Sequence, residues 1–225
     1  GDRRLTDELN ARYETHYNYK RIYRLTQFVG LKAVIRRKRP QYQRSTLEVT
    51  AENILNRDFT AKTVNEKWLT DVTEFKYGDN AKLYLSAILD LKDKSIVSFV
   101  MGRNNNNKLV FDTFDLAVSK CPDAHPIFHS DRGFQYTSKQ FKARLDKAGM
   151  IQSMSRVGRC IDNGPMEGFW GILKCEMYYL SNFKDYESLV AAINSYMYFY
   201  NYERRQKKLN KMSPITYRQL LETVA

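Results

Sequence analysis

The sequence predicts an α/β fold in which a mixed five-stranded sheet carries helices on both faces. Three short segments rich in β-branched residues follow one another directly, and the later segments alternate between strand-like and helix-like patterns. Of the 225 residues, 43% are hydrophobic and 28% are charged. This balance allows a substantial core beneath an ordinary polar surface.

The first three strands are expected at residues 67–75, 82–91 and 94–102. Each segment is short and apolar, and tight turn residues separate it from the next. Because short connections of this kind join antiparallel neighbours, we expect an antiparallel meander.

The following elements alternate in type. The polar run from Asn104 to Asn107 favours a turn and a helix cap before a helix over 109–118. A strand at 126–130, a helix at 140–149 and a strand at 151–155 come next, and then helices that begin near 163–165, cover 185–202 and occupy 214–222. Three antiparallel strands followed by helix-linked strands form a mixed sheet, which is the strand order of the ribonuclease H-like fold.

The N-terminal part of the chain is strongly basic. Residues 18–44 contain nine cationic side chains and no acid, and apolar residues recur at helical spacing until Gly30, where we expect the helix to end. This composition is typical of a helix and arm that lie on DNA phosphates, and the alternative is a solvated charged face. The net charge of +12 favours a polyanionic partner.

Composition also disfavours some classes of protein. No apolar run approaches the roughly 18–20 residues that a membrane-spanning helix needs, so we expect no membrane association. Cys121, Cys160 and Cys175 form no CxxC pair, and the three histidines lack zinc-finger spacing. We therefore expect neither a disulfide framework nor structural zinc, and a reducing cytosol as the compartment.

One acid lies within an expected strand. Strand alternation places Asp71 on the same face as Leu69 and Phe75. A carboxylate among large apolar neighbours is costly unless a basic side chain or a metal ion partners it. Glu74 points to the other face near the end of the strand, and we expect it at the surface.

Two further acids lie at the ends of expected elements. Asp131 follows the strand at 126–130, where α/β proteins bind ligands, although a turn-forming role also explains it. Glu167 lies in the first turn of the helix after Gly164 and Pro165, where capping and the helix dipole also favour an acid. Together with Asp71, however, they would supply the oxygen ligands that two divalent cations need. Without a cation, such clustered carboxylates would repel one another.

Four ordered motifs carry a resemblance: TDVTEF (70–75), HSDRGFQYTS (129–138), SMSRVGRCIDNGPMEGFWGILKCE (153–176) and YNYERRQKKLNKMSPITYR (200–218). They resemble the bacterial insertion-sequence transposases of the retroviral-integrase superfamily. More narrowly, they resemble the insertion-sequence-three family, whose integrase-like product is encoded by a second, frameshifted reading frame. The resemblance covers nearly the whole chain, including the basic segment at 19–39, and the 35 residues between Asp131 and Glu167 fit the family spacing. Gly164, where family members often have Ala, and Arg205-Gln206, where many have Pro-His, depart from the pattern.

The resemblance implies that Asp71, Asp131 and Glu167 are the catalytic acids and bind two magnesium or manganese ions. It implies a basic helical DNA-binding segment at 1–45, a linker at 46–62, an integrase-type catalytic core at 63–203 and a basic helical tail at 204–225. The implied partners are double-stranded DNA of the element ends and target, the first-reading-frame product of the same element, and further copies of the chain in a homodimer or larger oligomer. The implied location is the bacterial cytoplasm, at the nucleoid.

DNA contacts are expected from side chains around the acids and in the basic segments. Lys174 lies seven residues beyond Glu167 on the same helix face, and the resemblance implies a basic residue there that contacts the DNA end. The alternative is a solvated lysine. The other expected contacts are Arg132, Arg156, Asn163, Lys20, Arg21, Arg36, Arg37, Lys38, Arg39 and Arg204.

The expected reaction is phosphoryl transfer on DNA. Water activated on one metal ion would attack a phosphodiester at the element end, and the freed 3′-hydroxyl would attack a second phosphodiester while the other ion stabilises the leaving oxygen. A non-catalytic DNA-binding remnant and a ribonuclease H-type nuclease are the alternatives. The presence of all three acids disfavours the remnant, and a nuclease would not need the basic arm. We assign no chemistry to Asp90 or Asp93, which turn and edge positions explain, and a structural role to His129.

Overall fold

The computed structural model describes residues 1–31, 51–156 and 160–224. Its helices are α1 (Asp2–Arg12), α2 (Tyr19–Phe28), α3 (Asn107–Lys120), α4 (Lys139–Lys147), α5 (Gly164–Glu176), α6 (Tyr186–Tyr198) and α7 (Pro214–Val224). Its strands are β1 (Lys67–Tyr77), β2 (Ala81–Asp90), β3 (Ile96–Gly102), β4 (Ile127–Ser130) and β5 (Ile151–Met154). None of the described helices is long and apolar enough to cross a membrane. The expected contacts Arg36, Arg37, Lys38 and Arg39 lie outside the described residues.

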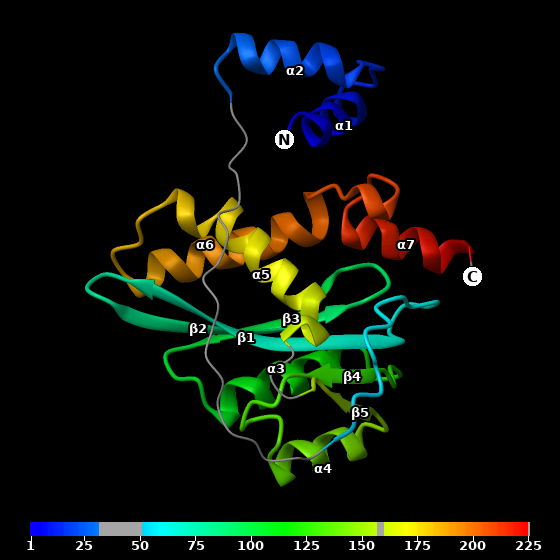
Figure 1. Cartoon of the computed structure of the whole chain (residues 1–225), viewed down its shortest axis with the longest axis vertical. Coiled ribbons are helices and arrows are strands. Elements are labelled where there is room, and N and C mark those ends of the chain that lie inside the picture. The colour runs from blue at the N-terminus through cyan, green and yellow to red at the C-terminus, as the bar shows by residue number, and fades with distance from the viewer. Residues whose placement is uncertain (32–50, 157–159, 225) are drawn as a thin grey trace.

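The five strands form one mixed sheet in the order β3-β2-β1-β4-β5 (Figure 1). β1, β2 and β3 are antiparallel neighbours, whereas β4 is parallel to both β1 and β5. The antiparallel meander and the helix-linked later strands predicted from the sequence are therefore confirmed.

Helices cover both faces of the sheet, and each face has its own core (Figure 1). On one face, Leu69 and Phe75 of β1 pack in a cluster with residues of α5 and α6. On the other face, Trp68 of β1 packs in a cluster with residues of α3 and α4. The alternation predicted for β1 is thus confirmed, because residues of even and odd number in this strand enter different cores.

The helix ends also follow local sequence signals. The Asn106 side chain accepts a hydrogen bond from the backbone of Leu109 at the start of α3, and Ser138 caps α4 in the same way. Gly30 follows α2 with φ +71°, a conformation that glycine adopts without steric cost. The helix expected over 185–202 ends at Tyr198 and continues as a π-helical turn over Phe199–Glu203.

The N-terminal part contains two helices, of which only the second was expected as a distinct element. α1 and α2 pack against each other. Along α2 the apolar residues do not form a buried stripe, because Ile22 is buried whereas Tyr23, Leu25 and Phe28 are exposed.

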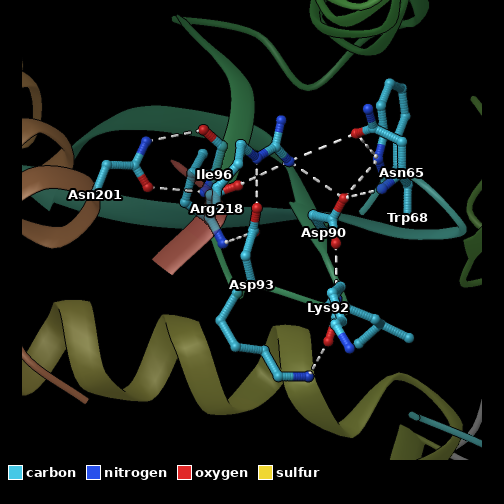
Figure 2. A network of polar contacts seen from close by, with 11 residues as sticks. Asn65, Trp68, Asp90, Lys92, Asp93, Ile96, Asn201 and Arg218 are labelled. Atoms are coloured by element: carbon cyan, nitrogen blue, oxygen red, sulfur yellow. Dashed lines mark hydrogen bonds and ion pairs between the residues drawn. The ribbon is translucent and has the colours of Figure 1, made fainter. Parts of the chain in front are cut away.

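A buried ionic network fixes α7 to the turn between β2 and β3 (Figure 2). Asp90 and Asp93 are both completely buried. Arg218 of α7 forms ion pairs with both carboxylates, at 3.3 Å to Asp90 and closer to Asp93. The expected turn and edge positions therefore do not fully explain these two acids, because both are buried and pair with the same arginine, which is distant in the sequence.

Backbone and indole N–H groups satisfy the remaining acceptor positions of Asp90. The backbone of Asn65 donates to Oδ2 and that of Lys92 to Oδ1, each at 2.7 Å, and Trp68 Nε1 lies 3.3 Å from Oδ2 (Figure 2). Burial and the neighbouring Asp93 nevertheless raise the pKa of Asp90 to about 6. The network therefore depends on the Arg218 charge.

Candidate active site

Asp71 and Asp131 lie side by side on parallel neighbours of the sheet. The strand register pairs Leu69 of β1 with His129 of β4, and each aspartate follows two residues later along its own segment. Adjacent strands lie about 4.8 Å apart, so the two carboxyl groups occupy neighbouring positions. Parallel pairing of β1 with β4 is thus what brings the first two expected acids together.

Two hydrogen bonds orient Asp71. Its Oδ1 accepts from the Val72 backbone N–H at 2.8 Å, and its Oδ2 accepts from Trp170 Nε1–H of α5 at 3.0 Å. Burial and the nearby charges of Asp131 and Glu167 raise the pKa of Asp71 to about 7. The charges of both other expected acids therefore act on Asp71.

The N-terminus of α5 is fastened to β1 directly beside Asp71. Asn163 is buried and its amide donates to the Thr70 carbonyl oxygen at 3.0 Å. This contact places Glu167, in the first turn of α5, near enough for its charge to act on Asp71. Trp170 follows Glu167 by three residues and so lies one helical turn further along the same side.

The chemistry of this site suits a hard divalent cation. Burial raises the pKa of Asp131 as well as that of Asp71, so the protein disfavours two neighbouring negative charges here. A bound cation would remove that penalty, and carboxylate oxygens are the ligands that magnesium prefers. Within the described residues no three acidic, histidine or cysteine side chains converge into a ready-made chelating group. The charge and proximity of Asp71 and Asp131 nevertheless fit a metal-binding role.

A tight turn holds the Asp131 carboxylate. Its Oδ1 accepts from the Gly133 backbone N–H at 2.9 Å. A Cβ atom at Gly133 would lie 3.1 Å from that same oxygen and 2.9 Å from Oε1 of Gln135. Glycine is therefore needed at this position because the carboxylate folds back over the backbone.

Gly133→Ala is expected to lower the rate of DNA strand transfer about tenfold, a barrier increase of about 1.4 kcal/mol, because the new methyl group displaces the Asp131 carboxylate. Thermal unfolding should change little. Gly168→Ala is the matched control, because its Cβ would meet no atom within 4 Å and helix propensity favours alanine. Equal rates for the two variants would contradict this account of the turn.

Trp170 acts as a positioning residue for Asp71. Trp170→Phe keeps an aromatic ring in the core but removes the hydrogen bond to Oδ2, and hydrogen bonds to charged groups contribute about 1.5–3 kcal/mol. We expect a loss of about tenfold in the strand-transfer rate and a higher magnesium concentration for half-maximal rate.

Phe169→Leu provides the comparison for Trp170→Phe. Phe169 is buried in the same cluster and packs beside Trp170, with the two rings tilted and their centroids 5.0 Å apart. The Phe169→Leu variant should have a lower melting temperature, but the magnesium dependence of its strand-transfer rate should be unchanged. A similar magnesium dependence in both variants would mean that Trp170 serves only packing.

The expected DNA contacts next to the acids are engaged with the protein itself. Lys174 Nζ donates to the Glu74 carbonyl oxygen at 3.0 Å and lies 5.0 Å from the centroid of the Phe75 ring. Arg132 donates through Nε to the Ser155 carbonyl oxygen at 2.7 Å. Both side chains keep partial exposure, and a DNA contact from either remains a prediction.

Arg156 belongs to an ionic cluster around a buried acid. Asp162 is completely buried and accepts from the Arg156 guanidinium at 2.8 and 2.9 Å and from Arg57 at 2.7 Å. Arg156 is the largest influence holding the pKa of Asp162 well below its ordinary value. Arg156 remains exposed, and Asp162 orients it.

Two more of the expected DNA contacts are held by intramolecular partners, and a DNA contact from either residue remains a prediction. Asn163 is only 4% exposed and holds α5 to β1. Arg204 has a side chain 11% exposed and forms a bidentate ion pair with Glu176 at the C-terminal end of α5. Motif position alone did not reveal these intramolecular partners. By contrast, Lys20 and Arg21 lie exposed on α2.

His129 has the structural role expected from the sequence. It is completely buried, and its two ring nitrogens lie 2.9 and 3.1 Å from the hydroxyl oxygens of Ser153 and Ser155. Burial lowers its pKa to about 4, so the ring is neutral at pH 7. It joins β4 to β5 beneath Asp131.

Sequence reasoning missed the two residues that orient the site, Trp170 and Asp162. The available signal was their nearness to Glu167, because Trp170 follows it by three residues and Asp162 precedes it by five. Trp170, however, lies 99 residues from Asp71, and Asp162 lies 105 residues from Arg57, although its other partner Arg156 is near in the sequence.

Comparison with known families agrees with this geometry. Residues 61–160 and residues 167–220 each match an integrase core domain family, and residues 1–39 match an HTH-like domain family. The first two matches span the sheet, α5, α6 and most of α7, and together they contain all three acids.

Three bacterial relatives are similar over most of the chain. An uncharacterized transposase-like protein of Haemophilus influenzae is 41% identical over 89% of this chain and 93% of its own length. The putative transposase InsK for insertion sequence element IS150 of Escherichia coli is 40% identical over 97% of this chain and 77% of its own. Transposase InsF for insertion sequence IS3A of the same species is 33% identical over 95% of this chain and 75% of its own.

A solved structure shows the same fold. The HTLV-2 integrase catalytic core domain, determined in complex with magnesium, superposes with a TM-score of 0.56 at 20% identity over 71% of this chain and 99% of that domain. The mixed sheet with helices on both faces is therefore that of the ribonuclease H-like integrase core. With the integrase core matches and the extent of the bacterial similarity, the chain belongs to the insertion-sequence transposases of the insertion-sequence-three family.

Proposed function

We propose that this transposase cleaves a phosphodiester at the end of its insertion sequence and joins the freed end to another DNA strand, with Asp71, Asp131 and Glu167 as catalytic acids. The observation that carries the proposal is the placement of Asp71 beside Asp131, with the Glu167 charge near enough to help raise the Asp71 pKa. Three acids carried by β1, the end of β4 and the first turn of α5 would suit two magnesium or manganese ions.

The residues of the chain prepare this site. Asp71, Asp131 and Glu167 would hold the ions, which when bound supply electrostatic stabilisation of charge on the reacting phosphate. The Val72 and Trp170 N–H groups keep both oxygens of Asp71 in place, and the Gly133 N–H does the same for one oxygen of Asp131. These contacts orient the carboxylates before DNA arrives, and such preorganisation lowers the barrier to reaction.

We also propose a division of the chain on which this activity depends. Residues 1–45 would bind DNA through basic helices, residues 46–62 would link them to the core at 63–203, and residues 204–225 would form a basic helical tail. The exposed Lys20 and Arg21 on α2 support the first assignment, and the HTH-like match to residues 1–39 agrees with it. Element ends and target DNA, the first-reading-frame product and further copies of the chain are the proposed partners.

A strand-transfer assay tests the proposed function. A labelled DNA duplex with a pre-cut end of the element is incubated with plasmid, the purified chain and magnesium. Joined products are expected. Cleavage without joining would identify a nuclease, and binding without either reaction would identify a non-catalytic DNA-binding protein; each result would contradict the proposal. Removing magnesium with a chelator should abolish both cleavage and joining.

A further inference from the structure

A basic cleft lies between the N-terminal helix and the segment that follows α6. Its volume is about 310 Å³, and it lies where α1 faces residues 204–208. Asp7 is its one acidic lining residue. The cationic lining residues are Arg3, Arg4, Arg204, Arg205, Lys207 and Lys208.

Three ion pairs hold the two walls of the cleft together. Arg4 lies 2.8 Å from Glu176, which is the last residue of α5. Two further residues of α1 also form ion pairs across the cleft: Glu8 pairs with Arg205 at 2.8 Å, and Asp7 pairs with Lys211 at 2.7 Å. The cleft is therefore a built feature of the fold, in which α1 is attached to the catalytic core.

These pairs leave an excess of positive charge in the cleft. The Glu176 carboxylate is shared by Arg4 and Arg204, which outweigh the effect of burial and lower its pKa to about 2. Among the described residues, no ion pair is formed by Arg3, Lys207 or Lys208. Three cations thus line the cleft without a carboxylate of their own.

Like charges also meet at the rim of the cleft. Burial lowers the pKa of Lys94, and the nearby Lys208 lowers it further. An anion bound between Lys208 and the other cations of the cleft would relieve this repulsion. Lys207 and Lys208 are both exposed, so an approaching ligand reaches them without any rearrangement of the core.

A neutral donor adds to the same wall. Gln206 lines the cleft, and its buried Nε2 has no acceptor at normal hydrogen-bond geometry among the described residues, although it lies near the Tyr200 hydroxyl. Phosphate oxygens accept hydrogen bonds from amide groups as well as from cationic side chains. A phosphate could use this amide only after Gln206 turns its side chain towards the cleft, so the cationic side chains carry the binding.

We propose that this cleft binds backbone phosphates of duplex DNA, at a site separate from the catalytic acids. The choice of DNA as the source of the phosphates rests on the proposed function. The cleft is shared by α1, which belongs to the HTH-like part, and by the segment 204–208, which follows the core. A duplex held there would be anchored to both parts of the chain at once.

The test uses the full chain and a short fluorescent DNA duplex, with affinity measured over a range of salt concentrations. The double variant Lys207→Gln/Lys208→Gln should bind more weakly, and the slope of log affinity against log salt should fall by up to about 1.8, at about 0.9 for each lost phosphate contact. Lys207→Arg/Lys208→Arg should keep the affinity, because arginine also binds phosphates.

Lys139→Gln/Lys147→Gln is the matched control. Both lysines are exposed on α4, at the opposite end of the molecule from α1, and the control removes the same charge (Figure 1). The control should keep a slope close to that of the unmodified chain. A wild-type slope in the Lys207/Lys208 variant, or an equal loss in both variants, would overturn the cleft as a DNA site.

The outcome for the cleft is separable from that for the proposed function. The same preparations are assayed for strand transfer. If the unmodified chain joins no DNA while Lys207 and Lys208 still determine the salt slope, the proposed function fails and the cleft stands. If the chain joins DNA and the Lys207/Lys208 variant keeps the wild-type salt slope, the proposed function stands and the cleft fails as a DNA site.

Discussion

Asp71→Asn, Asp131→Asn and Glu167→Gln are each expected to lower the strand-transfer rate by at least about 10³-fold, or about 4 kcal/mol of barrier. Each substitution removes a negative oxygen ligand, and a divalent cation needs that charge to bind and to act. Rates would be measured with a pre-cut DNA end and magnesium. A rate near that of the unmodified chain in any one variant would remove that acid from the site.

Glu74→Gln is the control for these three variants. Glu74 lies three residues from Asp71 but on the other face of β1, where its carboxylate pairs with Lys82 at 3.0 Å. It should keep its strand-transfer activity, and its stability should fall by about 1 kcal/mol or less, since the pair is partly exposed.

The same variants separate lost chemistry from lost folding. The pKa of Asp71 in the folded protein, about 7, lies above its ordinary value of 3.8, so ionisation of this carboxyl group opposes folding. That penalty is absent below about pH 4, grows as the pH rises and is complete above pH 7. Without magnesium at pH 8, Asp71→Asn should therefore melt at or above the temperature of the unmodified chain, and magnesium should stabilise the variant less. A large loss of stability at pH 8 would contradict this.

Arg218→Met is expected to lower the free energy of unfolding by about 3–5 kcal/mol at pH 8, because it leaves the buried carboxylates of Asp90 and Asp93 without their cation. Denaturant unfolding measures the loss. Arg144→Met is the control. Its partner Asp115 is 56% exposed, and the loss should be about 1 kcal/mol or less.

The loss in Arg218→Met should also depend on pH with a definite sign. The pKa of Asp90 is already raised to about 6, and removal of the guanidinium raises it further. Protonation of the carboxyl groups then relieves the uncompensated charge, so the loss is complete above the folded pKa and becomes smaller towards pH 5. Adding Asp90→Asn and Asp93→Asn should restore part of the stability at pH 8. A loss independent of pH, without such rescue, would mean that α7 is held by apolar packing alone.

The sequence by itself determined the elements of the core and the identity of the acids. Periodicity of two placed Leu69 and Phe75 on one face of β1 and Trp68 on the other, and turn and cap residues marked the ends of α3 and α4. These features are local, because each depends on residues within a few positions along the chain. The spacing of the motifs then indicated the family, which the comparisons confirm. The catalytic roles of the acids remain predictions.

Only the tertiary structure decided which side chains meet. Trp170 reaches Asp71 because α5 lies across β1, and Arg218 reaches Asp90 and Asp93 because α7 returns to the β2–β3 turn. Arg204 pairs with Glu176 because the segment after α6 returns to the C-terminal end of α5, a partner that its motif did not indicate. A buried charge must find a partner, but the partner is chosen by how distant elements pack, and no local pattern of residues encodes that choice.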